Sequence, residues 1–157
     1  MFTTFHEHII RVSHGPQDGI SASDFWDALM EYVHKPQEFV EHLSASEILE
    51  RNESENGLRL RRQLHFSNVV VTDTVDVHTA TREIVTMVDG TADFPPSSFV
   101  IKLEEPEADN LFVRFLYEEE ARNENPMFED VRKQAYQDKD EFLVRELLQR
   151  IFQKHAN

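Results

Sequence analysis

The chain has 157 residues, no cysteine and a formal net charge of −14, from 16 Lys and Arg against 30 Asp and Glu. This length fits a single domain over residues 1–157, with an ordinary core that needs neither disulfides nor a structural metal. The acidic charge argues against nucleic acid and anionic membranes as partners, and no apolar run reaches the ~18 to 20 residues of a membrane insertion.

The first residues combine charged and apolar side chains, so they lack the continuous apolar segment of a secretory signal. We therefore expect an intracellular, cytoplasmic protein. The chain also holds 12 phenylalanines, whose large side chains suit either a core or a ligand cavity.

The N-terminal part predicts one strand and two short helices. Apolar and polar residues alternate over 5–12, which is typical of a strand, and a polar loop follows. Ser21 and Asp24 have the spacing of a capping box, and apolar residues then recur at helical spacing. Pro36 ends that helix, because proline disfavours helical geometry at the residue before it, and it opens a second short helix over 37–43.

The middle of the chain predicts six further strands. Alternating patterns run from about Ser46 to Glu120, and turn-forming residues interrupt them at 56–57, 67–68, near 79, at 89–96 and at 106–110. Seven antiparallel strands with helices gathered on one face form an α+β arrangement.

The end of the chain predicts one long helix. The helical period returns after Pro126, and no later proline or glycine interrupts it. A helix of roughly 25 residues would be ~38 Å long, which is enough to cross the sheet. Its expected buried stripe is Phe128, Val131, Ala135, Phe142, Leu147 and Ile151.

The order of elements resembles the helix-grip fold of the START and birch-pollen-allergen-like (SRPBCC) superfamily. The segments 36–40, 104–107, 111–117 and 133–136 narrow the resemblance to the AtaL-like family, found in secondary-metabolite clusters. The resemblance implies a START-like ligand-binding domain whose curved sheet wraps the C-terminal helix and leaves a cavity. It implies no reaction, since the family has no agreed one, and it supplies no catalytic motif.

A predicted hairpin over 57–77 places one charged pair among four apolar pairs. With a two-residue turn at 67–68, Arg62 faces Asp73 on the side of the sheet that carries the apolar residues. Both charged side chains are therefore expected to point inward. They form either an anchor for the polar group of an apolar ligand or a structural ion pair.

His6 and His8 share one face of the first strand, so His8 is expected to face the same interior. It is either an acid or base for catalysis or a hydrogen-bonded core histidine. Two alternating histidines without further ligands predict no metal site. Glycine-rich nucleotide loops and the Gly-x-Ser-x-Gly motif are absent from the sequence, and we expect no cofactor.

In the last helix, Asp138 lies three residues after Ala135 and four before Phe142. Asp138 and Tyr136 either line the cavity, with Tyr117 approaching from the sheet, or the acidic residues of this section face water. The predicted ligand-binding wall is His8, Trp26, Arg62, Leu64, Asp73, Val75, Phe115, Tyr117, Tyr136, Asp138 and Phe142.

Three functions follow as hypotheses. The first is binding of an apolar or aromatic small molecule in an internal cavity between the sheet and the C-terminal helix. The second is a cofactor-independent cyclase, isomerase or dehydratase that acts on a secondary-metabolite intermediate. The third is a homodimer that uses Phe112 and Leu116 on the outer face of the sheet.

Overall fold

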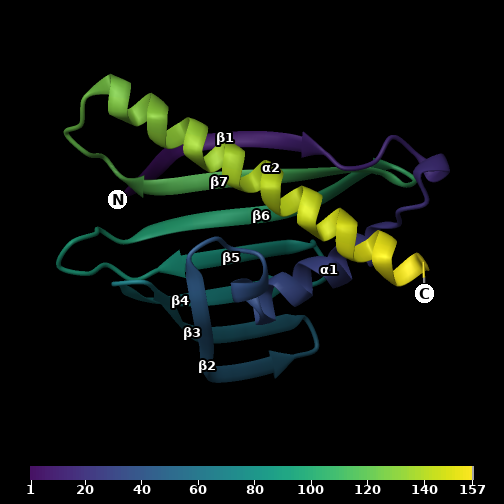
Figure 1. Cartoon of the computed structure of the whole chain (residues 1–157), viewed down its shortest axis with the longest axis horizontal. Coiled ribbons are helices and arrows are strands. Elements are labelled where there is room, and N and C mark those ends of the chain that lie inside the picture. Colours follow the sequence, from purple (N-terminus) through teal and green to yellow (C-terminus); the bar gives the residue numbers. More distant parts are fainter. Residues whose placement is uncertain (157) are drawn as a thin grey trace.

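The computed structural model describes residues 1–156 and shows one antiparallel sheet with two helices packed on its inner face (Figure 1). The strands follow the spatial order β1-β7-β6-β5-β4-β3-β2, which confirms the predicted α+β class with seven strands. The strands are β1 (Phe2–Arg11), β2 (Leu43–Ser54), β3 (Gly57–Phe66), β4 (Val70–His78), β5 (Glu83–Val88), β6 (Ser97–Glu107) and β7 (Asn110–Glu120). The helices are α1 (Ala22–His34) and α2 (Pro126–Ala156), and single 3-10 turns lie at Pro16–Asp18 and Pro36–Glu38.

The register of the hairpin between β3 and β4 is the predicted one. Arg62 lies opposite Asp73, Leu64 opposite Val71 and Leu60 opposite Val75. Leu60 and Val75 are buried, so the apolar side of the hairpin faces the helices. A shift of one residue would have exposed this whole set, and the burial gain therefore fixes the register.

Helix α1 begins with the predicted capping box. Ser21 Oγ accepts a hydrogen bond from the Asp24 backbone at 3.0 Å, and the Asp24 carboxylate accepts one from the Ser21 backbone. The second short helix predicted over 37–43 is wrong, because only one 3-10 turn follows Pro36. His42 has a φ of 67°, which no right-handed helix accommodates, and β2 begins at the next residue.

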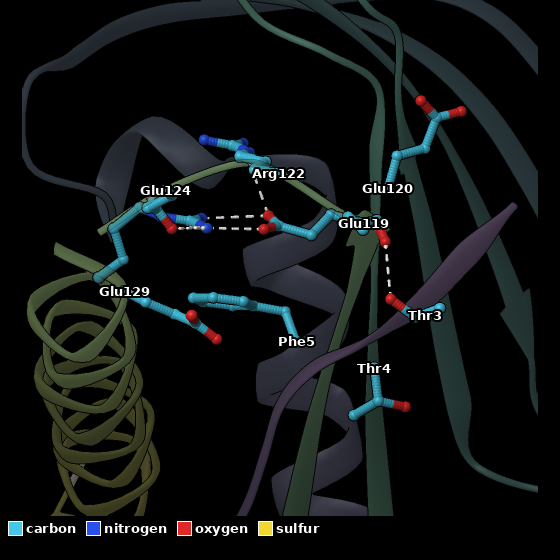
Figure 2. A pocket seen from close by; sticks show the side chains of 10 residues that line it. Thr3, Thr4, Phe5, Glu119, Glu120, Arg122, Glu124 and Glu129 are labelled. Atoms are coloured by element: carbon cyan, nitrogen blue, oxygen red, sulfur yellow. Dashed lines mark hydrogen bonds and ion pairs between the residues drawn. The ribbon is translucent and has the colours of Figure 1, made fainter. Parts of the chain in front are cut away.

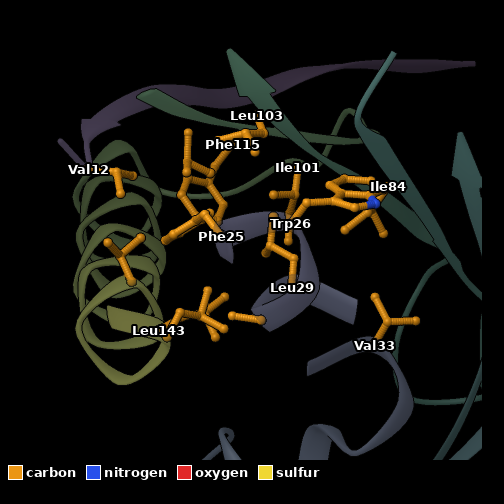
Figure 3. Packing of buried hydrophobic residues seen from close by; sticks show 14 of the residues in the cluster. Val12, Phe25, Trp26, Leu29, Val33, Ile84, Ile101, Leu103, Phe115 and Leu143 are labelled. Carbon is orange, nitrogen blue, oxygen red and sulfur yellow. The ribbon is translucent and has the colours of Figure 1, made fainter. Parts of the chain in front are cut away.

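The core lies between α1, the inner face of the sheet and the C-terminal half of α2 (Figure 3). Phe25 and Leu29 of α1 are fully buried, in one cluster with Ile101 of β6 and Phe115 of β7. Each such side chain contributes roughly 1.5–3 kcal/mol to stability through burial. This packing holds α1 against the sheet and fills the space beneath it.

Helix α2 buries a different face from the one predicted. Its buried residues are Asp140, Leu143, Val144, Leu147 and Ile151, whereas Phe128, Val131 and Phe142 are 63%, 61% and 44% exposed. Leu147 and Ile151 were therefore correct, but the first four residues of the predicted stripe point outward.

Within residues 1–156, no helix is long and apolar enough to cross a membrane.

Candidate functional site

A buried carboxylate lies between the last strand and the last helix. Asp140 of α2 is 2% exposed, and its oxygens accept a hydrogen bond from the Tyr117 hydroxyl at 2.7 and 2.8 Å. His8 Nε2 of β1 lies 2.7 Å from Asp140 Oδ2. Residues from β1, β7 and α2 therefore meet at one carboxylate, which the alternation of β1 and β7 and the helical phase of α2 bring together.

Burial shifts the protonation of this group. It raises the pKa of Asp140, against the opposing effects of Lys139, Tyr117 and His8. Burial and the Asp140 charge together raise the pKa of Tyr117 well above its ordinary value, so its hydroxyl keeps its proton. The cluster can thus hold a proton among three groups away from bulk water, which suits acid and base chemistry.

A bulge extends this cluster along β1. Thr4 lies opposite Glu118 and His6 opposite Tyr117, so Phe5 is an extra residue in the ladder. Phe5 contacts the edge of the Tyr136 ring, with 6.0 Å between ring centroids, and the His6 ring stacks on that of His8 at 5.3 Å. His6 Nε2 is buried and has no hydrogen-bond partner among the described residues.

Three aromatic rings meet next to Asp140. The rings of Tyr117 and Tyr136 stack with 4.1 Å between centroids, and Phe99 of β6 stacks on Tyr117 at 5.8 Å. The Lys139 amine lies 5.5 Å from the centroid of each of these rings. The amine therefore lies against a stack of three aromatic rings, although the Lys139 residue as a whole is exposed.

An ion-pair network joins the end of β7 to the beginning of α2 (Figure 2). Arg132 donates to Glu119 at 2.6 Å and to Glu124 at 2.8 Å, and Arg122 lies 3.5 Å from Glu119. The Arg132 guanidinium also lies 4.0 Å from the centroid of the Phe5 ring. A small pocket of ≈ 170 Å³ opens here, and both of its arginines are already paired with Glu119 or Glu124.

A larger and less polar open pocket lies where the ends of several strands approach α2. It has a volume of ≈ 380 Å³, which is in the range of small-molecule sites. Its wall is formed by the turn between β3 and β4, the loop between β5 and β6, and α2. The lining residues are Phe66, Val69, Val71, Val88, Asp89, Thr91, Phe94, Pro95, Ser97, Arg122 and Tyr136. Two other hollows adjoin Phe142, one between α2 and the segment 37–41 and one on the surface of α2, and no strand residue lines either of them.

Arg62 and Asp73 point inward as predicted, and helix α1 binds the third guanidinium nitrogen of Arg62. Arg62 Nε and Nη2 donate to the two Asp73 oxygens at 2.9 and 2.6 Å, and Nη1 donates to the Val33 carbonyl at 2.7 Å. Both side chains are almost fully buried. This geometry corresponds to the structural ion pair, which fastens the C-terminal end of α1 to the sheet.

The other predicted wall residues separate into groups. His8, Tyr117 and Tyr136 gather around Asp140, and Tyr136 also lines the open pocket. Asp138 is exposed and accepts a hydrogen bond from Gln134, which agrees with the alternative that it faces water. Phe142 is exposed, so its place on the predicted buried stripe was wrong. The remaining predicted residues lie in the packed core or at its margin: Trp26, Leu64, Val75 and Phe115.

Sequence reasoning missed Asp140 and Lys139, although a signal for Asp140 exists. Asp140 is four residues after Tyr136 and three before Leu143, so it shares their helix face. A carboxylate in an otherwise apolar face would have been the better candidate. The outer residues Phe112 and Leu116 are half-buried, and Arg11 covers the Phe112 ring at 5.1 Å.

The described residues offer no obvious metal site. Within residues 1–156, no three His, Asp or Glu side chains are gathered so that they could hold a metal ion.

Comparison with known proteins identifies the family and the fold. The sequence model of AtaL, "Acetylaranotin biosynthesis cluster protein L", matches residues 12–151. No curated protein sequence matches the chain.

Three solved structures illustrate the shared fold. Ara h 8.0201 has a TM-score of 0.63 at 18% identity, covering 95% of this chain and 99% of that one. A START superfamily protein from Mycobacterium smegmatis has a TM-score of 0.60 at 16% identity, covering 92% and 97%. The Zhui aromatase/cyclase from Streptomyces sp. R1128 has a TM-score of 0.52 at 17% identity, covering 99% and 87%. The chain therefore belongs to the AtaL family and has the helix-grip fold of the START and birch-pollen-allergen-like superfamily.

Proposed function

We propose that this protein binds a mainly apolar or aromatic small molecule in the open pocket between the strand ends and α2. The observation that carries the proposal is the wall of this pocket. Phe66, Val71, Val88 and Phe94 provide apolar surface from β3, β4, β5 and the following loop, and Tyr136 closes the side toward α2. A few polar groups at its edge, among them Arg122, suit the orientation of one polar substituent.

Binding of a neutral solvatochromic naphthalene dye such as PRODAN tests this proposal. The dye should gain and blue-shift fluorescence with wild-type protein, since it moves from water into an apolar pocket. Val71→Phe fills the pocket from the inner face of β4 and should weaken binding about tenfold or more, the equivalent of ~1.4 kcal/mol.

Val70→Phe is the matched control, because Val70 is the neighbouring residue on the opposite face of β4 and is 49% exposed. It should leave the affinity unchanged. Equal effects of the two substitutions, or no dye binding by the wild-type protein, would contradict the proposal.

The buried cluster favours proton-transfer catalysis as a second candidate function. His8, Tyr117 and Asp140 share one hydrogen-bonded centre, and Tyr136 links this centre to the pocket wall by stacking on Tyr117. Such a centre suits a cofactor-independent cyclase, isomerase or dehydratase. One of the three solved structures compared above is itself named an aromatase/cyclase.

Hydrogen exchange of an acidic ketone tests the second candidate. In deuterated buffer, 2-tetralone should exchange its α-protons faster with wild-type protein than with buffer alone. Asp140→Asn should remove this excess while dye binding persists. Asp138→Asn, an equal change of charge at an exposed position, should retain it. No excess exchange with the wild-type protein counts against catalysis and leaves the binding function standing.

A further inference from the structure

We propose that Phe99, Tyr117 and Tyr136 form a cation site for the ammonium group of an apolar amine, and that Lys139 is its displaceable intramolecular occupant. This inference rests on the proposed binding function and names the chemical class of the ligand. The rings come from β6, β7 and α2, and the Lys139 amine lies 5.5 Å from all three centroids. Ammonium groups are attracted to such faces, and the attraction is strongest where water is excluded.

Lys139 differs from neighbouring lysines in what holds its charge. Lys133 lies 3.5 Å from Glu129, and Lys154 lies 2.5 Å from Glu31. Within residues 1–156, the Lys139 amine has neither an ion-pair nor a hydrogen-bond partner, so the rings are its main contacts. The residue is also exposed overall, and its long side chain can therefore turn outward without breaking a salt bridge.

The charges around the rings favour a cation over an anion. Tyr117 donates its hydroxyl to the Asp140 carboxylate, which increases the electron density of its ring. Desolvation of the amine beside the rings lowers the pKa of Lys139, while the Asp140 charge raises it. A permanently charged quaternary ammonium group does not lose its charge on desolvation, and it would therefore replace Lys139 more readily than a second primary amine would.

Tyr136 connects this site to the apolar pocket. Its ring stacks on Tyr117 in the cation site and also forms part of the pocket wall. A ligand whose aromatic or aliphatic body occupies the pocket can thus place a nearby amine against the three rings. The expected ligand is an amphipathic amine with its cationic group close to an apolar ring system.

Ligand-observed NMR titration with three probes of similar shape tests this inference. The probes are phenyltrimethylammonium, its neutral isostere tert-butylbenzene and the anion benzoate. Lys139→Met removes the internal competitor and should tighten binding of phenyltrimethylammonium about tenfold relative to wild type, with little change for tert-butylbenzene. Lys133→Met is the matched control, because it removes an equal charge from the same helix, and it should leave binding unchanged.

Tyr136→Leu should abolish the preference for the cation over its neutral isostere. Circular dichroism and thermal melting confirm that each variant is folded. If Lys139→Met binds tert-butylbenzene as tightly as phenyltrimethylammonium, the cation site is overturned, but the proposed binding pocket stands. Benzoate binding most tightly to wild type, and losing affinity in Lys139→Met, also overturns it, since Lys139 would then pair with the ligand. Failure of all three probes overturns the inference together with the proposed function.

Discussion

Tyr117 of β7 donates its hydroxyl to the Asp140 carboxylate of α2, with 2.7 and 2.8 Å between the phenolic oxygen and the two acceptor atoms. The two residues are 6% and 2% exposed, so this contact joins the last strand to the last helix inside the protein. A buried charge that loses a donor is costly, and the contact therefore stabilises the position of α2 on the sheet.

Tyr117→Phe should lower the free energy of unfolding by about 1–3 kcal/mol, because the buried carboxylate loses a hydrogen-bond donor. Urea denaturation at neutral pH measures this loss. In an Asp140→Asn background the same substitution should cost less, since no carboxylate remains to be stranded. Equal costs in the two backgrounds would show that Tyr117 acts through packing alone.

Arg62→Met should lower the free energy of unfolding by roughly 3–5 kcal/mol, because it leaves Asp73 charged and buried. The double variant Arg62→Met with Asp73→Leu should be more stable than this single variant. Chemical denaturation of both proteins checks the order. Arg59→Met provides the control, since Arg59 pairs with Asp76 at the surface and its loss should cost less than about 1 kcal/mol. The prediction is wrong if the double variant is no more stable than Arg62→Met.

His6 should make folding sensitive to mild acid. Burial lowers the pKa of His6, and the neighbouring charges of His8 and Lys133 lower it further, while Asp140 raises it. Between the ordinary and the lowered pKa, the unfolded chain binds more protons than the folded one, so the free energy of unfolding falls as the pH drops through this window.

Urea denaturation midpoints at pH 7.5 and pH 5.5, on the order of one unit either side of the ordinary histidine pKa, measure this effect. The decrease should be smaller in His6→Gln than in the wild type. His78→Gln changes an exposed position, and its urea midpoint should decrease as much as that of the wild type. An unchanged decrease in His6→Gln would assign the acid sensitivity to another group.

The adjacent residues Phe142 and Leu143 test which face of α2 is buried. Leu143 is 5% exposed and Phe142 is 44% exposed. Leu143→Ala should therefore cost about 2–5 kcal/mol, and Phe142→Ala less than about 1 kcal/mol, when thermal or chemical unfolding of the two variants is compared. A larger loss of stability for Phe142→Ala than for Leu143→Ala would mean that the helix face predicted from the sequence is the buried one.

The hairpin of β3 and β4 shows where reasoning from the sequence succeeds. Its two strands alternate strictly, and its turn is short, so the pairing of Arg62 with Asp73 could be predicted from neighbouring residues alone. The hydrogen bond from Arg62 to the Val33 carbonyl could not be predicted in this way, because Val33 is 29 residues away along the chain. That contact favours the structural pair over the ligand anchor.

Helix α2 shows where such reasoning fails. Large apolar residues such as Phe128 and Phe142 suggested one buried face, while Asp140 interrupts the face that is buried. Hydrophobicity ranks Phe142 above Asp140 as a core residue. The hydrogen bonds with Tyr117 and His8 and the nearby Lys139 charge make the burial of Asp140 tolerable. The two hydrogen-bond partners lie on two strands that the sequence order separates widely.

The amino-acid pattern alone therefore determined the class of fold, the number of strands, the end of α1 and the strand register of one hairpin. These features depend on periodicity, turn residues and proline, which act over a few neighbouring positions. Only the tertiary structure decided that Asp140 meets Tyr117 and His8, that Lys139 lies against three rings and that a pocket opens beside Tyr136. The physical reason is that the rotation and crossing of α2 over the sheet result from the packing of the whole core, and a single segment does not specify them.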